Sequence, residues 1–193
     1  MKKIGIFGGT FDPVHRGHVK IARLVKRKFG LDQVIFIPAG LRPHKAASVA
    51  SAIDRLAMVR LALGKTKGFS ISAFEVRRKS PSYTINTVRY WKRRLGKKAR
   101  VFFIIGADAF REIRTWKKWR ELLLLCDFIV VNRPGYREQA TPAGVKGAIN
   151  YWRIPDIPIS ATKIRELLRR GQPVKQLVPP AVSQYIKKKK LYQ

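Results

Sequence analysis

The sequence predicts an α/β protein in which helices cover both faces of a doubly wound parallel sheet, giving three layers. Short apolar runs of strand length alternate with segments whose apolar residues recur at helical spacing, an order typical of parallel strands joined by helices. Polar motifs directly follow most of the runs, so they would gather at one edge of the sheet, where the strands end. The chain has 193 residues and no internal repeat, so we expect one domain over residues 1–193, with a C-terminal helical part from about residue 160 packed on it.

The first strand and helix enclose the most informative motif. An apolar run over residues 4–7 predicts a buried strand, and helical spacing over residues 19–25 predicts a helix. Between them stands GGTFDPVHRGH, residues 8–18, at a strand-to-helix turn, where backbone N–H groups face a ligand. Gly8 and Gly9 would let the backbone approach a phosphate, and His18 falls where the helix dipole favours anions. The motif predicts a phosphate-handling site; the alternative is a tight turn in which His15 and His18 are incidental.

Two better-known phosphate motifs do not fit this stretch. The dinucleotide fingerprint requires G-x-G-x-x-G, and Gly5, Gly8 and Gly9 do not give that spacing. The P-loop requires a lysine after its last glycine, whereas Gly17 is followed by His18. Neither a dinucleotide loop nor a P-loop is therefore expected.

The rest of the chain continues the alternation of strands and helices. Further strands are predicted over residues 34–37, 69–72, 101–105 and 128–131, with a short one near 150–154. Helices are predicted over residues 53–63, 84–95 and 160–168, and a last helix follows Pro179–Pro180 and ends in four lysines. The stretch from Tyr136 to Pro158, rich in glycine and proline, shows no other clear pattern.

Several polar residues beyond these strands each have a structural and a functional interpretation. Lys45, after the second strand, is placed to meet a phosphate, or it is an incidental surface lysine. Asp108, after strand 101–105, would cap the next helix, bond a ribose hydroxyl or order a metal-bound water. Ser160 is an expected N-cap, and Arg165 is placed to reach back over the same helix N-terminus towards a phosphate.

The helix over residues 84–95 and the tryptophans beyond it carry two interpretations as well. Ser82 or Thr84 would cap that helix; its exposed N-terminal amides would otherwise hold a carboxylate or phosphate. Trp116 and Trp119, three apart on a predicted helix, most often indicate core packing, although one could stack on an aromatic ligand ring.

Composition limits the class of protein. The 42 Lys and Arg against 11 Asp and Glu give a formal charge of +31, which normally suggests nucleic acid, but the basic residues are spread along the chain without an RNP, zinc-finger or helix-turn-helix signature. We interpret the charge as a solvated surface that attracts anionic nucleotides and adheres loosely to polyanions. No apolar run reaches 18 residues, the first strand begins too early for a leader segment, and Cys126 is the single cysteine. We therefore expect a cytoplasmic protein in which Cys126 is an ordinary buried thiol.

Taken together, the motifs resemble those of the bacterial nicotinate-nucleotide adenylyltransferases, a branch of the H-x-G-H nucleotidyltransferase superfamily. The matching segments are GGTFDPVHRGH (8–18), RPHK (42–45), SPSYT (80–84), IIGAD (104–108), TWKKW (115–119), VNRPG (131–135) and ISATKIRELL (159–168). The resemblance implies a Rossmann-like fold of the nucleotidyltransferase type. It also implies transfer of the adenylyl group of ATP to nicotinate mononucleotide, giving nicotinate adenine dinucleotide and pyrophosphate with Mg²⁺, in NAD biosynthesis.

The resemblance also implies a role for each matching residue. His18, Lys45 and Arg165 would be catalytic. The residues that would bind ATP are Gly8, Gly9, Thr10, Phe11, His15, His18, Gly106, Asp108, Ser160, Thr162 and Arg165. Those that would bind nicotinate mononucleotide are Asp12, Lys45, Tyr83, Thr84, Trp116 and Arg133, with the amides of Tyr83 and Thr84 on the carboxylate and Trp116 stacked on the pyridine ring. Mg²⁺ would be held mainly by ATP phosphates and water, without a protein ligand.

Arg16 and three alternative functions complete the expectations. Arg16 stands where the family more usually has an aromatic residue, and we expect it to face outward. The protein could prefer nicotinamide mononucleotide, a choice that the Tyr83–Thr84 loop would decide. Phosphopantetheine adenylyltransferases share the first motif but lack the SYT and TWKKW segments, and a nucleic-acid-binding module on the same fold is supported by charge alone. We expect small-molecule substrates, no specific nucleic acid and no membrane partner; the oligomeric state is left open, with a homodimer as one option.

Overall fold

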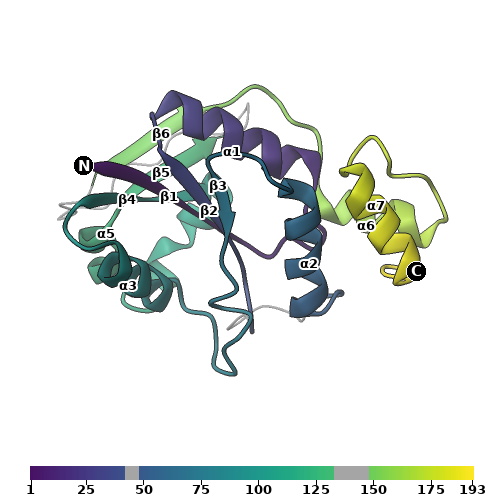
Figure 1. Ribbon diagram of the computed structural model, residues 1–193, viewed down its shortest axis with the longest axis horizontal. Coiled ribbons are helices and arrows are strands. Elements are labelled where there is room, and N and C mark those ends of the chain that lie inside the picture. The colour runs from purple at the N-terminus through teal and green to yellow at the C-terminus, as the bar shows by residue number, and fades with distance from the viewer. Residues whose placement is uncertain (42–47, 133–147) are drawn as a thin grey trace.

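The computed structural model describes residues 1–41, 48–132 and 148–193 and confirms the α/β architecture (Figure 1). The described strands form one parallel sheet in the order β3-β2-β1-β4-β5-β6. Each coincides with a strand predicted from the sequence. Their bounds are β1 (Lys2–Gly9), β2 (Gln33–Pro38), β3 (Phe69–Ile71), β4 (Ala99–Gly106), β5 (Asp127–Asn132) and β6 (Ile149–Arg153).

Helices cover both faces of this sheet. One face packs against α1 and α2, whose core cluster extends into the C-terminal helices α6 and α7, and the other face packs against α3, α4 and α5. The helix bounds are α1 (Arg16–Lys28), α2 (Ala52–Leu63), α3 (Thr84–Leu95), α4 (Ala107–Arg111), the 3₁₀ turn η1 (Ile113–Thr115), α5 (Trp119–Leu125), α6 (Ala161–Arg169) and α7 (Pro180–Lys188).

Side chains of the central strands alternate between the two cores. In β1, Ile4 and Ile6 join the cluster under α3 and α5, whereas Phe7 joins the cluster under α1 and α2. In β4, Phe103 and Ile104 divide in the same way. Both faces are apolar because both are covered, which explains why these strands stand out in the sequence as continuous apolar runs.

The strand order fixes where a ligand can bind. The chain runs outward from β1 to β3 and then returns to β4, which pairs with the other side of β1. In such a sheet the crevice opens beyond the carboxyl ends of the two strands at which the order reverses. Here these strands are β1, which ends in Gly8–Gly9, and β4, which ends in Gly106. Two of the predicted motifs therefore meet at this point.

The C-terminal helices lie together beside α2, at one end of the molecule (Figure 1). Val182 and Ile186 of α7 are buried in the cluster that also contains residues of α1 and α2. The helix ends at Lys188 rather than after four lysines, because Lys190 adopts the left-handed conformation with φ of 50°. The predicted end of this helix was therefore two residues too late.

The structure bears on two expectations, the absence of a membrane span and the burial of Cys126. Within the described ranges, no helix combines the length and apolar character that crossing a bilayer requires. Cys126 is 6% exposed, and its thiol lies 3.7 Å from the carbonyl oxygen of Leu122. Burial raises the pKa of the Cys126 thiol to about 12, and the prediction of an ordinary buried thiol is confirmed.

Candidate active site

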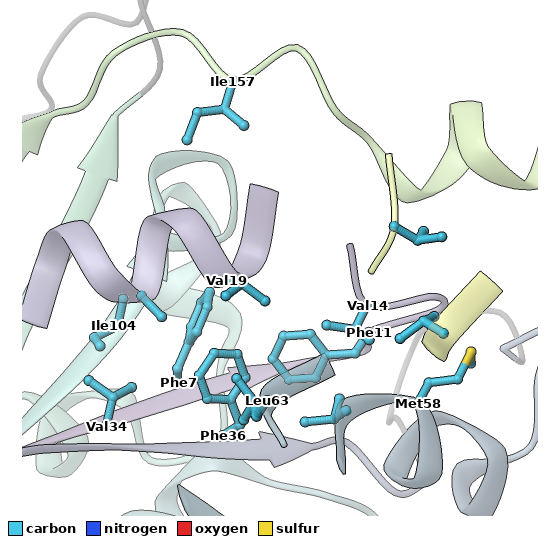
Figure 2. Packing of buried hydrophobic residues seen from close by; sticks show 14 of the residues in the cluster. Phe7, Phe11, Val14, Val19, Val34, Phe36, Met58, Leu63, Ile104 and Ile157 are labelled. Atoms are coloured by element: carbon cyan, nitrogen blue, oxygen red, sulfur yellow. The ribbon is translucent and has the colours of Figure 1, made fainter. Parts of the chain in front are cut away.

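Phe11 belongs to the first motif, over residues 8–18, and places its ring in the core. It has a positive φ of 52°, a conformation that a bulky residue seldom adopts and that costs about 1–3 kcal/mol. Its side chain is 2% exposed, and its ring centroid lies 5.7 Å from that of Phe7, 5.6 Å from Phe36 and 5.0 Å from His18. Figure 2 shows the rings of Phe7, Phe11 and Phe36 gathered below α1. The Phe11 side chain therefore packs in the core against His18, and its place in the lining of the ATP site remains a prediction.

Gly9 is required by this packing. A Cβ atom added there would lie 2.9–3.2 Å from three atoms of the Phe11 ring, closer than carbon atoms pack. Core packing thus gives a reason for glycine at position 9, and the expectation that the backbone here approaches a phosphate remains a prediction. The main chain at Gly9 and Thr10 still forms the end of β1 and the start of the motif loop.

His15 and His18 are fixed by a reciprocal pair of hydrogen bonds at the start of α1. The His18 N–H donates to Nδ1 of His15 at 3.4 Å, and the His15 N–H donates to Nδ1 of His18 at 3.2 Å. Their rings stack with centroids 3.6 Å apart. Because Nδ1 accepts in both rings, the proton of each neutral imidazole resides on Nε2. Two N–H donors and a helix N-terminus are thereby oriented at the end of β1.

Asp12 has a buried carboxylate that protein donors occupy on both oxygens. Oδ2 accepts the N–H of Val49 at 2.8 Å, and Oδ1 accepts the N–H of Ala50 at 3.1 Å and the hydroxyl of Tyr192 at 2.7 Å. Asp12 itself is 6% exposed. This geometry gives the side chain a structural role, and its expected contact with a mononucleotide remains a prediction.

Arg55 of α2 holds the same loop from inside the protein. Its guanidinium donates from Nη1 to the carbonyl oxygen of Thr10 at 2.7 Å, and the residue is 2% exposed. The sequence analysis did not identify it. The signal was present, because Arg55 stands three and four residues before Met58 and Val59, on the buried face of α2.

Arg165 is brought to the first motif from the far end of the chain. Ser160 is the N-cap of α6, accepting the N–H of Lys163 at 3.2 Å, so the predicted cap is confirmed. From the second turn, Arg165 donates from Nη1 to the carbonyl oxygen of Asp12 at 2.8 Å and from Nη2 to Oγ1 of Thr162 at 3.3 Å. Its Nε is buried without a hydrogen-bond partner among the described residues. The guanidinium therefore lies against the motif loop with a donor still unused.

The amino end of α3 forms a second group of donors. Tyr83 is the N-cap, and no side chain of the described residues caps the helix. Ser82 instead accepts the N–H of Gly40 at 3.0 Å, and Thr84 is the first helical residue. The expectation that one of these two hydroxyls caps α3 is therefore wrong. The Tyr83 N–H donates to the carbonyl oxygen of Pro81 at 3.1 Å, so the amides at this helix start that keep the capacity to hold an anion begin at Thr84.

The loop TWKKW borders this helix start. Trp116 is the C-cap residue that follows η1. Trp119 is the first residue of α5 and comes after Lys118, which has a φ of 53°. The two tryptophans therefore do not share a helix. The sequence-based prediction that both lie on one helix is wrong. Trp116 packs edge-on against Phe103 with centroids 6.2 Å apart and is partly buried.

The carboxyl end of β4 contributes Gly106 and Asp108. Gly106 is exposed and is the N-cap residue of α4, where no side-chain capping bond is present among the described residues. Asp108 is exposed in the first turn of that helix, so its predicted capping role is wrong. Its carboxylate is open to solvent at the edge where the substrates are expected.

Glu75 lies between the first motif loop and the amino end of α3. It was not predicted as a site residue from the sequence. Its Oε1 accepts the hydroxyl of Thr87 in α3 at 2.6 Å, and the residue is 9% exposed. Burial raises the pKa of Glu75 above its ordinary value, and hydrogen bonds from Thr87, Ser82 and Gly40, with the nearby charge of Arg55, oppose the rise. Glu75 thus lies between Arg55, which holds the first motif, and the amino end of α3.

The remaining predicted residues are placed as follows. Lys45 and Arg133 lie outside the described residues. Arg16 is exposed, as expected, and its Nε donates to the carbonyl oxygen of Val178 at 3.3 Å. Within the described parts of the chain, no three or more His, Cys, Asp or Glu side chains are grouped as metal ligands would be.

Known proteins resemble this chain over its whole length. Residues 6–167 match the family model described as cytidylyltransferase-like. The chain is 40% identical to a probable nicotinate-nucleotide adenylyltransferase from Thermoanaerobacter sp. (strain X514), across 98% of this chain and 94% of the relative. It is 42% identical to a protein of the same description from Salinispora arenicola (strain CNS-205), across 96% and 99%. In fold it is similar to Plasmodium falciparum nicotinic acid mononucleotide adenylyltransferase complexed with NaAD, with a TM-score of 0.77 and 21% identity, across 100% of this chain and 98% of that one.

Proposed function

Since the chain belongs to the nicotinate-nucleotide adenylyltransferase family, we propose that it transfers the adenylyl group of ATP to nicotinate mononucleotide. The products are nicotinate adenine dinucleotide and pyrophosphate, and the reaction serves NAD biosynthesis. The observation that carries the proposal is the capping pair of His15 and His18. The pair fixes both imidazoles at the amino end of α1, which follows the end of β1, and the proposal assigns their Nε2 donors to the ligand in the crevice between β1 and β4.

The nucleophile in this reaction needs no general base. The phosphate monoester of a mononucleotide has a second pKa of about 6 and is largely ionised at neutral pH. Its oxygen attacks the α-phosphorus of ATP in line with the departing pyrophosphate, and no covalent intermediate with the protein is formed. Catalysis then consists of holding two polyanions in line and stabilising the charge that develops on the transferred phosphoryl group.

His18, Lys45 and Arg165 provide that stabilisation in the proposal. The Nε2–H of His18 and the N-terminal amides of α1 donate to ATP phosphates, with His15 beside them. Arg165, already held at the Asp12 carbonyl, contributes its guanidinium Nη2 group, which is on the exposed side of the side chain. Ser160 and Thr162 keep α6 in place for this contact, and Gly8, Gly9, Thr10 and Phe11 shape the floor of the ATP site.

The mononucleotide is assigned to the side of the crevice near α3. The amide of Thr84 binds the nicotinate carboxylate, joined by that of Tyr83 when it exchanges its bond to the Pro81 carbonyl for the substrate, and Trp116 covers the pyridine ring. Nζ of Lys117 lies over the Tyr83 ring, 4.4 Å from the ring centroid, and adds positive charge beside the amino end of α3. Lys45 and Arg133 bind phosphate from the flanking loops. Asp12 positions the loop.

The protein side of the crevice fits a Mg²⁺ ion that arrives with ATP. Asp108 is an exposed carboxylate at the end of β4, a hard oxygen donor suited to a water molecule in the ion's shell, and no protein cage is needed. When bound, Mg²⁺ neutralises charge on the phosphates of ATP. Gly106 keeps the neighbouring backbone accessible at that point.

The test is product analysis with purified protein, ATP, Mg²⁺ and nicotinate mononucleotide. We expect the dinucleotide and pyrophosphate in equal amounts, identified by chromatography and mass spectrometry. With ATP made chiral by a sulfur atom at the α-phosphorus, the product should show inversion, as a single in-line displacement requires. Retention of configuration, an adenylylated protein or hydrolysis of ATP without dinucleotide would each contradict the proposal.

A further inference from the structure

Tyr192 is a buried residue close to the end of the chain that reaches the first motif. Its side chain is 4% exposed and packs in the cluster that contains Phe11 and Val14. Its hydroxyl donates to Oδ1 of Asp12 at 2.7 Å, a contact across 180 positions of sequence. A neutral phenol that donates to a carboxylate makes one of the stronger kinds of hydrogen bond. Burial, followed by the bond to Asp12, raises the pKa of Tyr192, so the phenol keeps its donor proton.

Asp12 is a junction where three distant segments meet. Its carboxylate accepts the amides of Val49 and Ala50, which lead into α2, together with the Tyr192 hydroxyl. Its carbonyl oxygen accepts Nη1 of Arg165. The orientation of the Asp12 residue therefore sets where the guanidinium of Arg165 rests. The charge of Arg165 in turn lies close enough to act on the Tyr192 phenol.

We propose that Tyr192 is a positioning residue for adenylyl transfer, because its hydroxyl fixes Asp12 and Asp12 fixes Arg165 beside the phosphates. This inference rests on the proposed function. Tyr192 touches no substrate; it acts through the two residues that follow it in this chain of contacts. A displacement of about 1 Å at a group that stabilises the transition state can cost about 10²-fold in rate, so the effect should fall on kcat.

The chain offers a matched control in Tyr185 of α7. Its hydroxyl donates to Oδ1 of Asp54 at 2.8 Å, a tyrosine–aspartate bond of the same kind, directed at the first turn of α2. Tyr185→Phe and Tyr192→Phe each remove one hydroxyl that donates to a carboxylate. Only the second bond leads to Asp12 and Arg165.

The experiment compares the two variants with the wild-type protein in kcat, KM and hydrogen exchange. Loss of the Tyr192 hydroxyl should displace Arg165 and lower kcat by about tenfold or more in Tyr192→Phe, towards the loss of about 10²-fold that a displacement of about 1 Å causes. We expect its KM for ATP to stay within about threefold, and Tyr185→Phe to keep the wild-type kcat. Amide exchange in a peptide covering residues 10–18 should be faster in Tyr192→Phe and unchanged in Tyr185→Phe.

The outcomes separate the two proposals. A wild-type protein without turnover would refute the proposed function, while the exchange rates of the two variants would still decide whether Tyr192 fixes the loop. Wild-type kcat in Tyr192→Phe, an equal loss of kcat in both variants, or unchanged exchange over residues 10–18 would each overturn the positioning role.

Discussion

Replacing His18 by asparagine or by alanine separates its structural task from its chemical one. Nδ1 of His18 accepts the His15 N–H at 3.2 Å and so belongs to the helix cap, whereas Nε2 carries the proton that the proposed function assigns to the ATP phosphates. An asparagine places its Oδ1 where the imidazole has Nδ1, so the cap acceptor is kept and the Nε2 donor is lost. Alanine loses both.

The magnitudes of the two losses differ enough to be measured apart. Removing one preorganised donor to developing charge costs about 10²- to 10³-fold in kcat. Removing a cap costs about 0.5–2 kcal/mol, and each kcal/mol lowers the Tm of a chain of this size by about 2–4 °C. We therefore expect similar kcat losses in His18→Asn and His18→Ala, with a lower Tm in His18→Ala alone.

The assays are steady-state pyrophosphate release for kcat and calorimetry for Tm, on the wild-type protein and both variants. A kcat within tenfold of wild type in folded His18→Asn would refute the assignment of the Nε2 donor. Equal loss of Tm in both variants would refute the capping argument. That argument requires the Oδ1 of asparagine to keep the hydrogen bond from the His15 N–H, and alanine to lose it.

Three further predictions concern packing and protonation. Gly9→Ala forces the new methyl group into the Phe11 ring and should destabilise the fold by about 1–3 kcal/mol, whereas Gly106→Ala, where no atom lies within 4 Å of the added Cβ, should leave Tm nearly unchanged; equal Tm values would contradict the packing argument. Because the pKa of Glu75 is raised, the folded protein holds this proton more tightly than the unfolded chain, so its contribution to stability is present below about pH 4.5 and declines as pH rises through the higher folded value. As the pH is raised from about 4 to about 8, Tm should therefore decrease less in Glu75→Gln than in the wild-type protein. Parallel curves of Tm against pH for the two proteins would contradict the raised pKa of Glu75. Cys126, with its pKa near 12, should react with a thiol reagent at about pH 8 only as fast as the protein unfolds; rapid labelling of the native protein would contradict its burial.

The parts of the structure that the sequence predicted are those that depend on local periodicity. Strand β4 is visible as a continuous apolar run because both of its faces are covered. The bounds of α3, Thr84–Leu95, were predicted without error because an apolar face and a following glycine mark them. The clustering of polar motifs followed from topology, since parallel strands bring their carboxyl ends to one edge.

The parts that were missed depend on contacts between distant segments. Nothing near position 192 indicates that its tyrosine bonds to Asp12, because 180 residues separate the partners. The inward turn of Phe11 follows from a positive φ, which residue type did not announce. Glu75 stands in a polar stretch that resembles an ordinary surface loop, and only the fold buries it against Thr87. Arg55 is the exception, since the spacing of Met58 and Val59 placed it on a buried face.

The most direct measurement is pyrophosphate release from ATP with Mg²⁺, comparing nicotinate mononucleotide with nicotinamide mononucleotide at equal concentration. The uncapped amide of Thr84 at the amino end of α3 and the positive charge of Lys117 favour a carboxylate over an amide, because only the carboxylate is charged. We predict a kcat/KM at least about tenfold higher for the acid, the ratio that one charge-assisted contact provides. Equal turnover of both, or preference for the amide, would contradict the assignment of the acid as substrate.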